Sequence, residues 1–200
     1  MKFNRYVDLE EGKDNISLPK LWLHGDRNKR TSFKDQKMDR DPYGNDSPNE
    51  SGPGIYFTQL LSEARNYAAP DGFIYQCEIT PNKVLTLNTK NSKIAIEKLI
   101  SWAEPENLKK YLENWDENPK LAFRKAVSNM VNHYSKLIDA AWTISNDEYA
   151  YDPNGWANSM LNLGYDAFYN EKRDHLIVYN PKIIRIVKEI PYGTENDEEL

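Results

Sequence analysis

Short runs of apolar and β-branched residues, each bounded by turn-forming residues, lie toward both ends of the chain. Such runs are typical of strands in a sheet. The pattern predicts strands at residues 21–23, 54–58, 73–79, 84–87, 165–169, 175–179 and 183–187. The first strand is expected to stop at a tight turn formed by His24 and Gly25.

Apolar residues at helical spacing mark other segments. They predict helices at residues 61–68, 91–103, 123–141 and 156–163. Asn118 and Pro119, a typical cap and first helical position, precede the third helix, and Gly164 ends the fourth. The long apolar stripe of the third helix is typical of a core face rather than of a cofactor site.

Strands at both ends with helices between them predict a single α+β domain over residues 1–200. The helices form an insertion at about residues 90–150, and an acidic tail occupies residues 194–200. A chain of 200 residues with 39% hydrophobic and 28% charged residues can bury a sizeable core. This composition excludes an intrinsically disordered chain.

The net charge of −5 is unevenly distributed. Without the four acidic residues among positions 195–199 it is −1, so bulk charge does not indicate a wrapped duplex DNA. The segment 26–53 is long, polar and rich in charge, with cations at Arg27, Lys29, Arg30, Lys34, Lys37 and Arg40. It is either a solvated loop or a loop that faces an anionic ligand.

The single cysteine, Cys77, excludes an intramolecular disulfide and a cysteine-cluster zinc site. With three histidines in the chain, we expect no metal site. The N-terminal residues lack the apolar run of a signal peptide, and no segment has the length of a membrane span. The expected location is therefore the cytoplasm, without a membrane partner.

Common nucleotide-loop, zinc-protease and serine-hydrolase motifs are absent from the sequence. Four other runs occur in a distinctive order and spacing: Leu21-Trp22-Leu23-His24-Gly25, Gly52-Pro53-Gly54-Ile55-Tyr56-Phe57, Ser62-Glu63-Ala64-Arg65-Asn66-Tyr67 and His175-Leu176-Ile177-Val178-Tyr179. Together they resemble the ADP-ribosyltransferases, in the His-Tyr-Glu branch that diphtheria toxin shares with the poly(ADP-ribose) polymerases. The resemblance covers residues 19–80 and 160–188 and omits the helical middle.

This resemblance implies a split antiparallel β-sandwich that binds NAD as a substrate. His24 would hydrogen-bond the adenosine ribose, and the backbone of Gly25 would hold the nicotinamide amide. Tyr56 and Tyr67 would enclose the nicotinamide ring, which suits aromatic faces. Arg27, or alternatively Arg30, would meet the pyrophosphate.

Two positions depart from the family pattern. Ala64 replaces a serine that bonds the nicotinamide amide. His175 replaces the glutamate that binds the ribose hydroxyls and stabilises the positive transition state, so the third catalytic position is a histidine. Asp174 or Glu171, on the adjoining turn, could supply the missing carboxylate if the strand is bulged there.

The resemblance therefore implies a mono-ADP-ribosyltransferase with His24, Tyr56 and His175 as its catalytic set. It would transfer ADP-ribose from NAD to a macromolecular acceptor, either a protein or a nucleic acid. The alternatives are an NAD glycohydrolase, or an inactive module that binds NAD, ADP-ribose or a partner protein. Position 175 separates these classes: if the third catalytic role needs a carboxylate and none reaches the site, the inactive binding module is favoured.

Overall fold

In the computed structural model, the described residues are 6–7, 17–34, 54–101, 118, 121, 124–125, 128–129, 134–140 and 153–192. The strands are β1 (Tyr6–Val7), β2 (Leu18–Pro19), β3 (Leu21–Asp26), β4 (Ile55–Thr58), β5 (Phe73–Ile79), β6 (Val84–Thr86), β7 (Ala167–Asn170), β8 (His175–Val178) and β9 (Ile184–Ile190). The labelled helices are α1 (Leu61–Ala68) and α5 (Pro153–Asn162), with a short 3-10 helix at Pro181–Ile183. Residues 93–101 are also helical.

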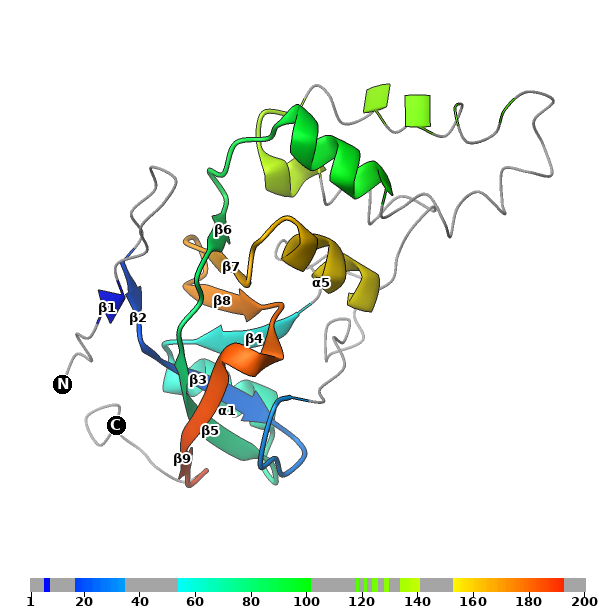
Figure 1. The fold of residues 1–200 in the computed structure, drawn as a ribbon. Coiled ribbons are helices and arrows are strands. Elements are labelled where there is room, and N and C mark those ends of the chain that lie inside the picture. Colours follow the sequence, from blue (N-terminus) through cyan, green and yellow to red (C-terminus); the bar gives the residue numbers. More distant parts are fainter. Residues whose placement is uncertain are drawn as a thin grey trace.

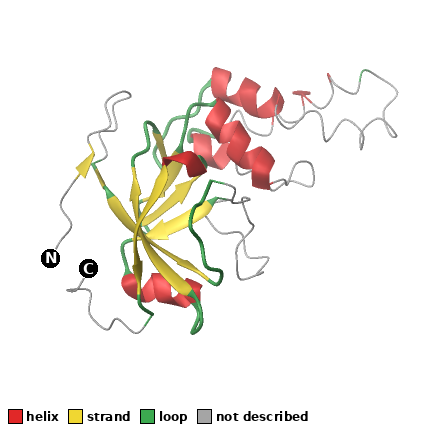
Figure 2. Cartoon of the chain, turned by 60° about the horizontal axis from the view of Figure 1, so that its bottom comes forward, coloured by secondary structure: helices red, strands yellow, loops and turns green. Residues whose placement is uncertain are grey.

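Seven strands form one mixed but mostly antiparallel sheet in the order β6-β7-β8-β4-β3-β5-β9 (Figures 1 and 2). Only β6 and β7 run parallel within it. The two halves of the sheet meet where β4 and β3 share a single residue pair, Leu23 with Thr58. The expected α+β class is confirmed, and the expected two sheets are hydrogen-bonded into one at this pair.

The prediction that the first strand stops at His24 and Gly25 is wrong. Strand β3 continues to Asp26, because its whole length pairs with β5, from Leu21 opposite Glu78 to Asp26 opposite Phe73. A glycine reads as a turn in the sequence, but here it lies inside a strand that continuous backbone pairing keeps extended.

Helix α1 explains why a glycine occupies position 25. Its buried residues Leu61, Ala64 and Ala68 pack on β3 in a small apolar cluster. A Cβ atom on Gly25 would lie 1.9 Å from the carbonyl oxygen of Ala64 and 2.7 Å from the nitrogen of Ala68. The glycine therefore permits close contact between the strand and the helix backbone.

The other helices cover the sheet at the end opposite α1 (Figures 1 and 2). Leu99 and Ile100, from the helix at residues 93–101, belong to the same buried cluster as Met160 of α5 and Phe168 of β7. The described start of the predicted insertion is thus packed against the sheet rather than separate from it.

The cap predicted at Asn118 is confirmed, because its Oδ1 accepts a hydrogen bond of 3.3 Å from the Leu121 amide. Gly164 follows α5 with a φ of 89°, the left-handed conformation expected where a helix ends. Phe123 and Val127 of the apolar stripe, and the acidic tail at residues 194–200, lie outside the described residues. None of the described helices has the length and apolar character needed to cross a membrane.

Candidate functional site

The four runs behind the family resemblance are neighbours in the structure. Strand β4 lies between β3 and β8 in the sheet, and α1 contacts both β3 and β4. Segments separated by more than a hundred residues in the sequence therefore meet around β4 (Figure 1).

Tyr56 and His175 lie on the same face of the sheet. Tyr56 is opposite Ile177, and Thr58 is opposite His175, in the β4–β8 pairing. Because side chains alternate along strands, this register directs Tyr56, Thr58 and His175 to one side. The rings of Tyr56 and His175 are nearly perpendicular, with centroids 6.2 Å apart.

Glu63 joins this group from the first turn of α1. Its Oε1 lies 2.5 Å from His175 Nε2, and its Oε2 accepts a hydrogen bond of 2.6 Å from the Thr58 hydroxyl. Thr58 Oγ1 in turn accepts the Leu60 amide at 3.1 Å. Since a carboxylate accepts hydrogen bonds, the contact is best made by a proton on His175 Nε2.

Burial differs within this group. The His175 side chain is 8% exposed, whereas the Glu63 side chain is 26% exposed. The histidine thus lies at the buried end of the cluster, and the carboxylate is the part that an approaching molecule can reach.

Sequence reasoning missed Glu63 and Thr58. Glu63 reads as an ordinary acid in the first turn of a helix, where it complements the helix dipole. The one indication in the sequence that Thr58 and Glu63 could interact was their separation of five residues. Its meaning depends on the β4–β8 register, which places Thr58 opposite His175.

The two carboxylates expected near position 175 do not contact His175. Asp174 has a φ of 54° and accepts a hydrogen bond of 2.7 Å from the Tyr169 hydroxyl. Burial, with the Asp174 carboxylate as a second cause, raises the pKa of Tyr169. Glu171 is exposed on the preceding turn. No bulge between β7 and β8 turns Asp174 toward the site, because their pairing is regular up to Asn170 and His175.

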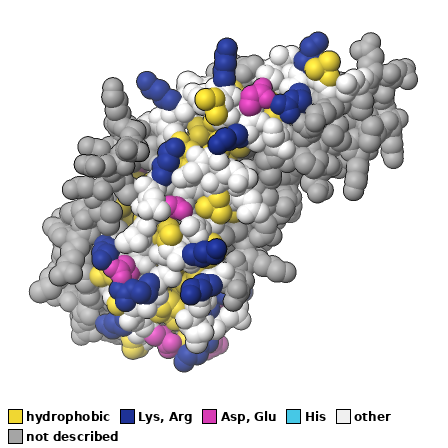
Figure 3. Space-filling view, viewed as in Figure 1, with side chains coloured by type: hydrophobic (Ala, Val, Ile, Leu, Met, Phe, Trp, Pro, Cys, Tyr) yellow, Lys and Arg dark blue, Asp and Glu magenta, His cyan; other side chains and the backbone are white. Residues whose placement is uncertain are grey.

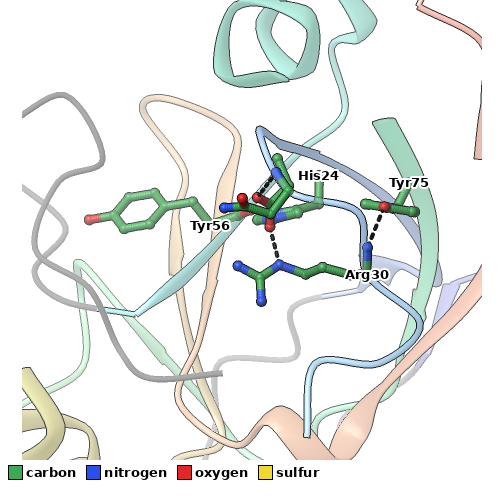
Figure 4. Close-up of polar contacts among 6 residues, drawn as sticks. His24, Arg30, Tyr56 and Tyr75 are labelled. Atoms are coloured by element: carbon green, nitrogen blue, oxygen red, sulfur yellow. Dashed lines mark hydrogen bonds and ion pairs between the residues drawn. The ribbon is translucent and has the colours of Figure 1, made fainter. Parts of the chain in front are cut away.

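His24 lies on the opposite side of β4 from the Tyr56 ring. It packs against Phe57 and Phe33, with ring centroids 5.2 and 4.9 Å away, and its Nδ1 donates to the Tyr56 carbonyl oxygen at 2.7 Å. Figure 4 shows the Tyr56 ring directed away from Arg30 and His24. The two residues are linked through the backbone rather than ring to ring.

The second ring nitrogen of His24 is buried. Nε2 lies 3.5 Å from Asp26 Oδ2, a close electrostatic contact that is too long for a good hydrogen bond. Among the described residues it has no hydrogen-bond partner. A buried polar atom without a partner calls for an explanation, and a ligand hydroxyl would supply the missing bond.

Asp26 anchors the chain after β3. Its carboxylate accepts the Asn28 amide at 2.8 Å and pairs with the Arg30 side chain, while the Arg30 amide donates to the Tyr75 hydroxyl at 2.7 Å (Figure 4). Burial raises the pKa of Asp26, but the contacts with His24, Arg30 and Asn28 outweigh it and lower the pKa to about 2.

The lowered pKa of Asp26 predicts a dependence of stability on pH. A depressed carboxyl pKa stabilises the fold above the unfolded value near 4, and this contribution is lost as the pH falls from about 4 to about 2. A shift of about two units corresponds to roughly 2.5 kcal/mol. Urea unfolding between pH 2 and 7 should show this loss in the wild type and not in Asp26→Asn. Parallel curves for the two proteins would contradict it.

The remaining predicted ligand residues are placed as follows. Tyr67 is half-buried on α1, one turn after Glu63 and on the same side of the helix. Ala64 is fully buried against β3. Arg27 is exposed, whereas the Arg30 guanidinium is paired with Asp26. Arg27 is therefore the freer of the two cations proposed for the pyrophosphate.

Basic side chains are spread over the described part of one face, with fewer acidic side chains among them (Figure 3). Strand β9, at the front of the same view, has exposed Arg185 and Lys188. Arg185 and Lys20 both pair with Glu78, so part of this charge is neutralised. Within the described ranges, no cluster of three or more His, Cys, Asp or Glu side chains could hold a metal ion.

Comparisons of the chain with protein-family models, with curated proteins and with solved structures find no match.

Proposed function

We propose that this protein is an NAD-dependent mono-ADP-ribosyltransferase. One observation carries the proposal: the separate runs that resemble this family converge around β4, with the Tyr56 ring 6.2 Å from the ring of His175. Chance similarity of short runs would give no reason for them to be spatial neighbours. The near-separation of the sheet between β3 and β4 is also compatible with the split sandwich of this family.

The reaction breaks the bond between nicotinamide and ribose through an oxocarbenium-like state. Positioning and charge placement contribute most of the catalysis in such a reaction. Tyr56, with Tyr67 of α1, offers aromatic surface to a flat and partly cationic ring. Arg27 offers the charge for the pyrophosphate.

In this proposal, His24 binds the adenosine ribose through Nε2, so a bound NAD has to pass between β3 and β4, which share a single residue pair, to reach both His24 and Tyr56. The absence of a hydrogen-bond partner for Nε2 among the described residues supports the role. Because Phe33 packs on the His24 ring and Arg30 pairs with the adjacent Asp26, both side chains have to move aside before a ribose hydroxyl reaches Nε2.

The acceptor in the proposal is a macromolecule. The basic face in Figure 3 suits an anionic acceptor and keeps nucleic acid beside protein as a candidate. Water as the acceptor would make the protein an NAD glycohydrolase, and absence of chemistry would leave a module that binds NAD, ADP-ribose or a protein.

These classes separate in one assay. Purified protein is incubated with NAD labelled in its adenosine part, with and without a cell lysate, while nicotinamide release and label transfer are measured. We expect release together with transfer that is sensitive to protease or nuclease. Release without transfer identifies a glycohydrolase. If NAD raises the melting temperature but no nicotinamide is released, the enzyme proposal fails and the binding module stands.

A further inference from the structure

We propose that Glu63 is the catalytic carboxylate of this site, supplied by α1 rather than by strand β8. The inference rests on the proposed transferase function and names the residue that fills its third catalytic role. His175 and Thr58 then act as positioning residues that hold the carboxylate.

The location of Glu63 suits this role. In the family pattern the carboxylate extends from the position of His175, and the Glu63 Oε1 atom is 2.5 Å from the tip of that histidine. The negative charge therefore lies just beyond the end of the His175 side chain, on the face that also carries the Tyr56 ring. A substitution that removed the carboxylate from one element is matched by a carboxylate from another.

The carboxylate is also held firmly. One oxygen contacts His175 and the other accepts from Thr58, and both partners lie on paired strands of the sheet. Each carboxylate oxygen has a second lone pair, so the group can still accept a ribose hydroxyl. With 26% of its side chain exposed, Glu63 remains open to a ligand while its orientation is fixed.

The step balances without a further reagent. The bond from ribose C1′ to the nicotinamide nitrogen breaks, and its electron pair leaves with neutral nicotinamide. Glu63 stabilises the resulting positive charge on the ribose and accepts a hydrogen bond from a ribose hydroxyl. An acceptor nucleophile then bonds to C1′, and the proton that it loses passes to the Glu63 carboxylate and on to solvent.

A purely structural role makes a different prediction. An acid in the first turn of a helix stabilises the fold slightly through the helix dipole. If this were its only function, replacement of Glu63 would lower stability slightly and leave the turnover of folded protein unchanged.

The test is Glu63→Gln, which keeps the shape and an oxygen acceptor but removes the charge. We expect nicotinamide release to fall by about a hundredfold, as for loss of one preorganised stabiliser of transition-state charge. The melting temperature should change little, and NAD should still stabilise the protein. Glu97→Gln, the same change at an exposed residue that pairs with Arg124, is the matched control and should retain full activity.

The double variant Glu63→Gln/His175→Glu provides a second measurement. If the site needs one carboxylate from either element, the double variant should release nicotinamide at least about tenfold faster than Glu63→Gln. A well-placed charge strongly stabilises the transition state, so restoring one should restore rate. Recovered activity would also show that the loss in Glu63→Gln is not caused by misfolding.

Three outcomes are decisive. Glu63→Gln activity within threefold of the wild type overturns the role of Glu63 and leaves the transferase function standing. Loss in the single variant without recovery in the double variant also rejects this role for Glu63. A wild-type protein that releases no nicotinamide rejects the proposed function and the catalytic role together.

Discussion

Replacement of Gly25 by alanine is expected to lower the free energy of unfolding by about 3 kcal/mol, the upper end for overpacking of a dense interior. The added Cβ would meet the backbone of α1 at 1.9 Å, and backbone atoms cannot turn aside as a flexible side chain can. Helix α1 would have to move away from β3 and expose part of its apolar cluster. Urea unfolding at neutral pH measures the change, and a loss below about 1 kcal/mol would show that α1 packs less closely.

Gly164→Ala is the matched control for this variant. Among the described residues, a Cβ there would meet one side-chain carbon, of Lys83, at 4.0 Å, so space is available. The free energy of unfolding should still fall by about 1–2 kcal/mol, because alanine disfavours the left-handed φ of 89° at this position. Because α1 also carries Glu63 and Tyr67, Gly25→Ala should reduce activity as well, whereas Gly164→Ala should not.

Tyr56→Ala is expected to reduce nicotinamide release by about a hundredfold or more, the scale on which misplaced reactants lose rate. The ring offers the flat surface that the proposal assigns to nicotinamide, and its edge-to-face position beside His175 links it to the carboxylate of Glu63. Steady-state assays of nicotinamide release from NAD measure the effect.

Tyr56→Phe separates loss of the ring from loss of the hydroxyl. It keeps the aromatic surface and should retain activity within about tenfold. The alanine variant also removes packing from a half-buried position, so its folded fraction has to be measured beside its rate. Unchanged turnover in folded Tyr56→Ala would remove Tyr56 from the site.

Local patterns predicted most of the elements around the site. The runs that became β4, β5 and β8 and the helix α1 have the alternation or spacing of their structures, and these patterns need no distant partner. The end of β3 was mispredicted because a glycine is compatible both with a turn and with a closely packed strand. Gly25 is a turn residue by composition, but close packing of α1 and pairing with β5 keep it in a strand.

The carboxylate that contacts His175 also lies outside the segment where the sequence suggested one. Asp174 is adjacent to His175 in sequence, yet its carboxylate is bound to the Tyr169 hydroxyl. Glu63 is 112 positions away and contacts the histidine directly. Sequence neighbours on a strand point to opposite faces, so adjacency was a poor guide to contact.

The sequence by itself determined the α+β class, most of the strands and the residue types that resemble an NAD site, because these depend on local spacing and residue identity. Only the tertiary structure decided which side chains share that site. The β4–β8 register directs Tyr56 and His175 to one face, and the packing of α1 on β3 brings Glu63 to them. Both depend on contacts between distant segments, whose relative placement is determined by burial of the whole core.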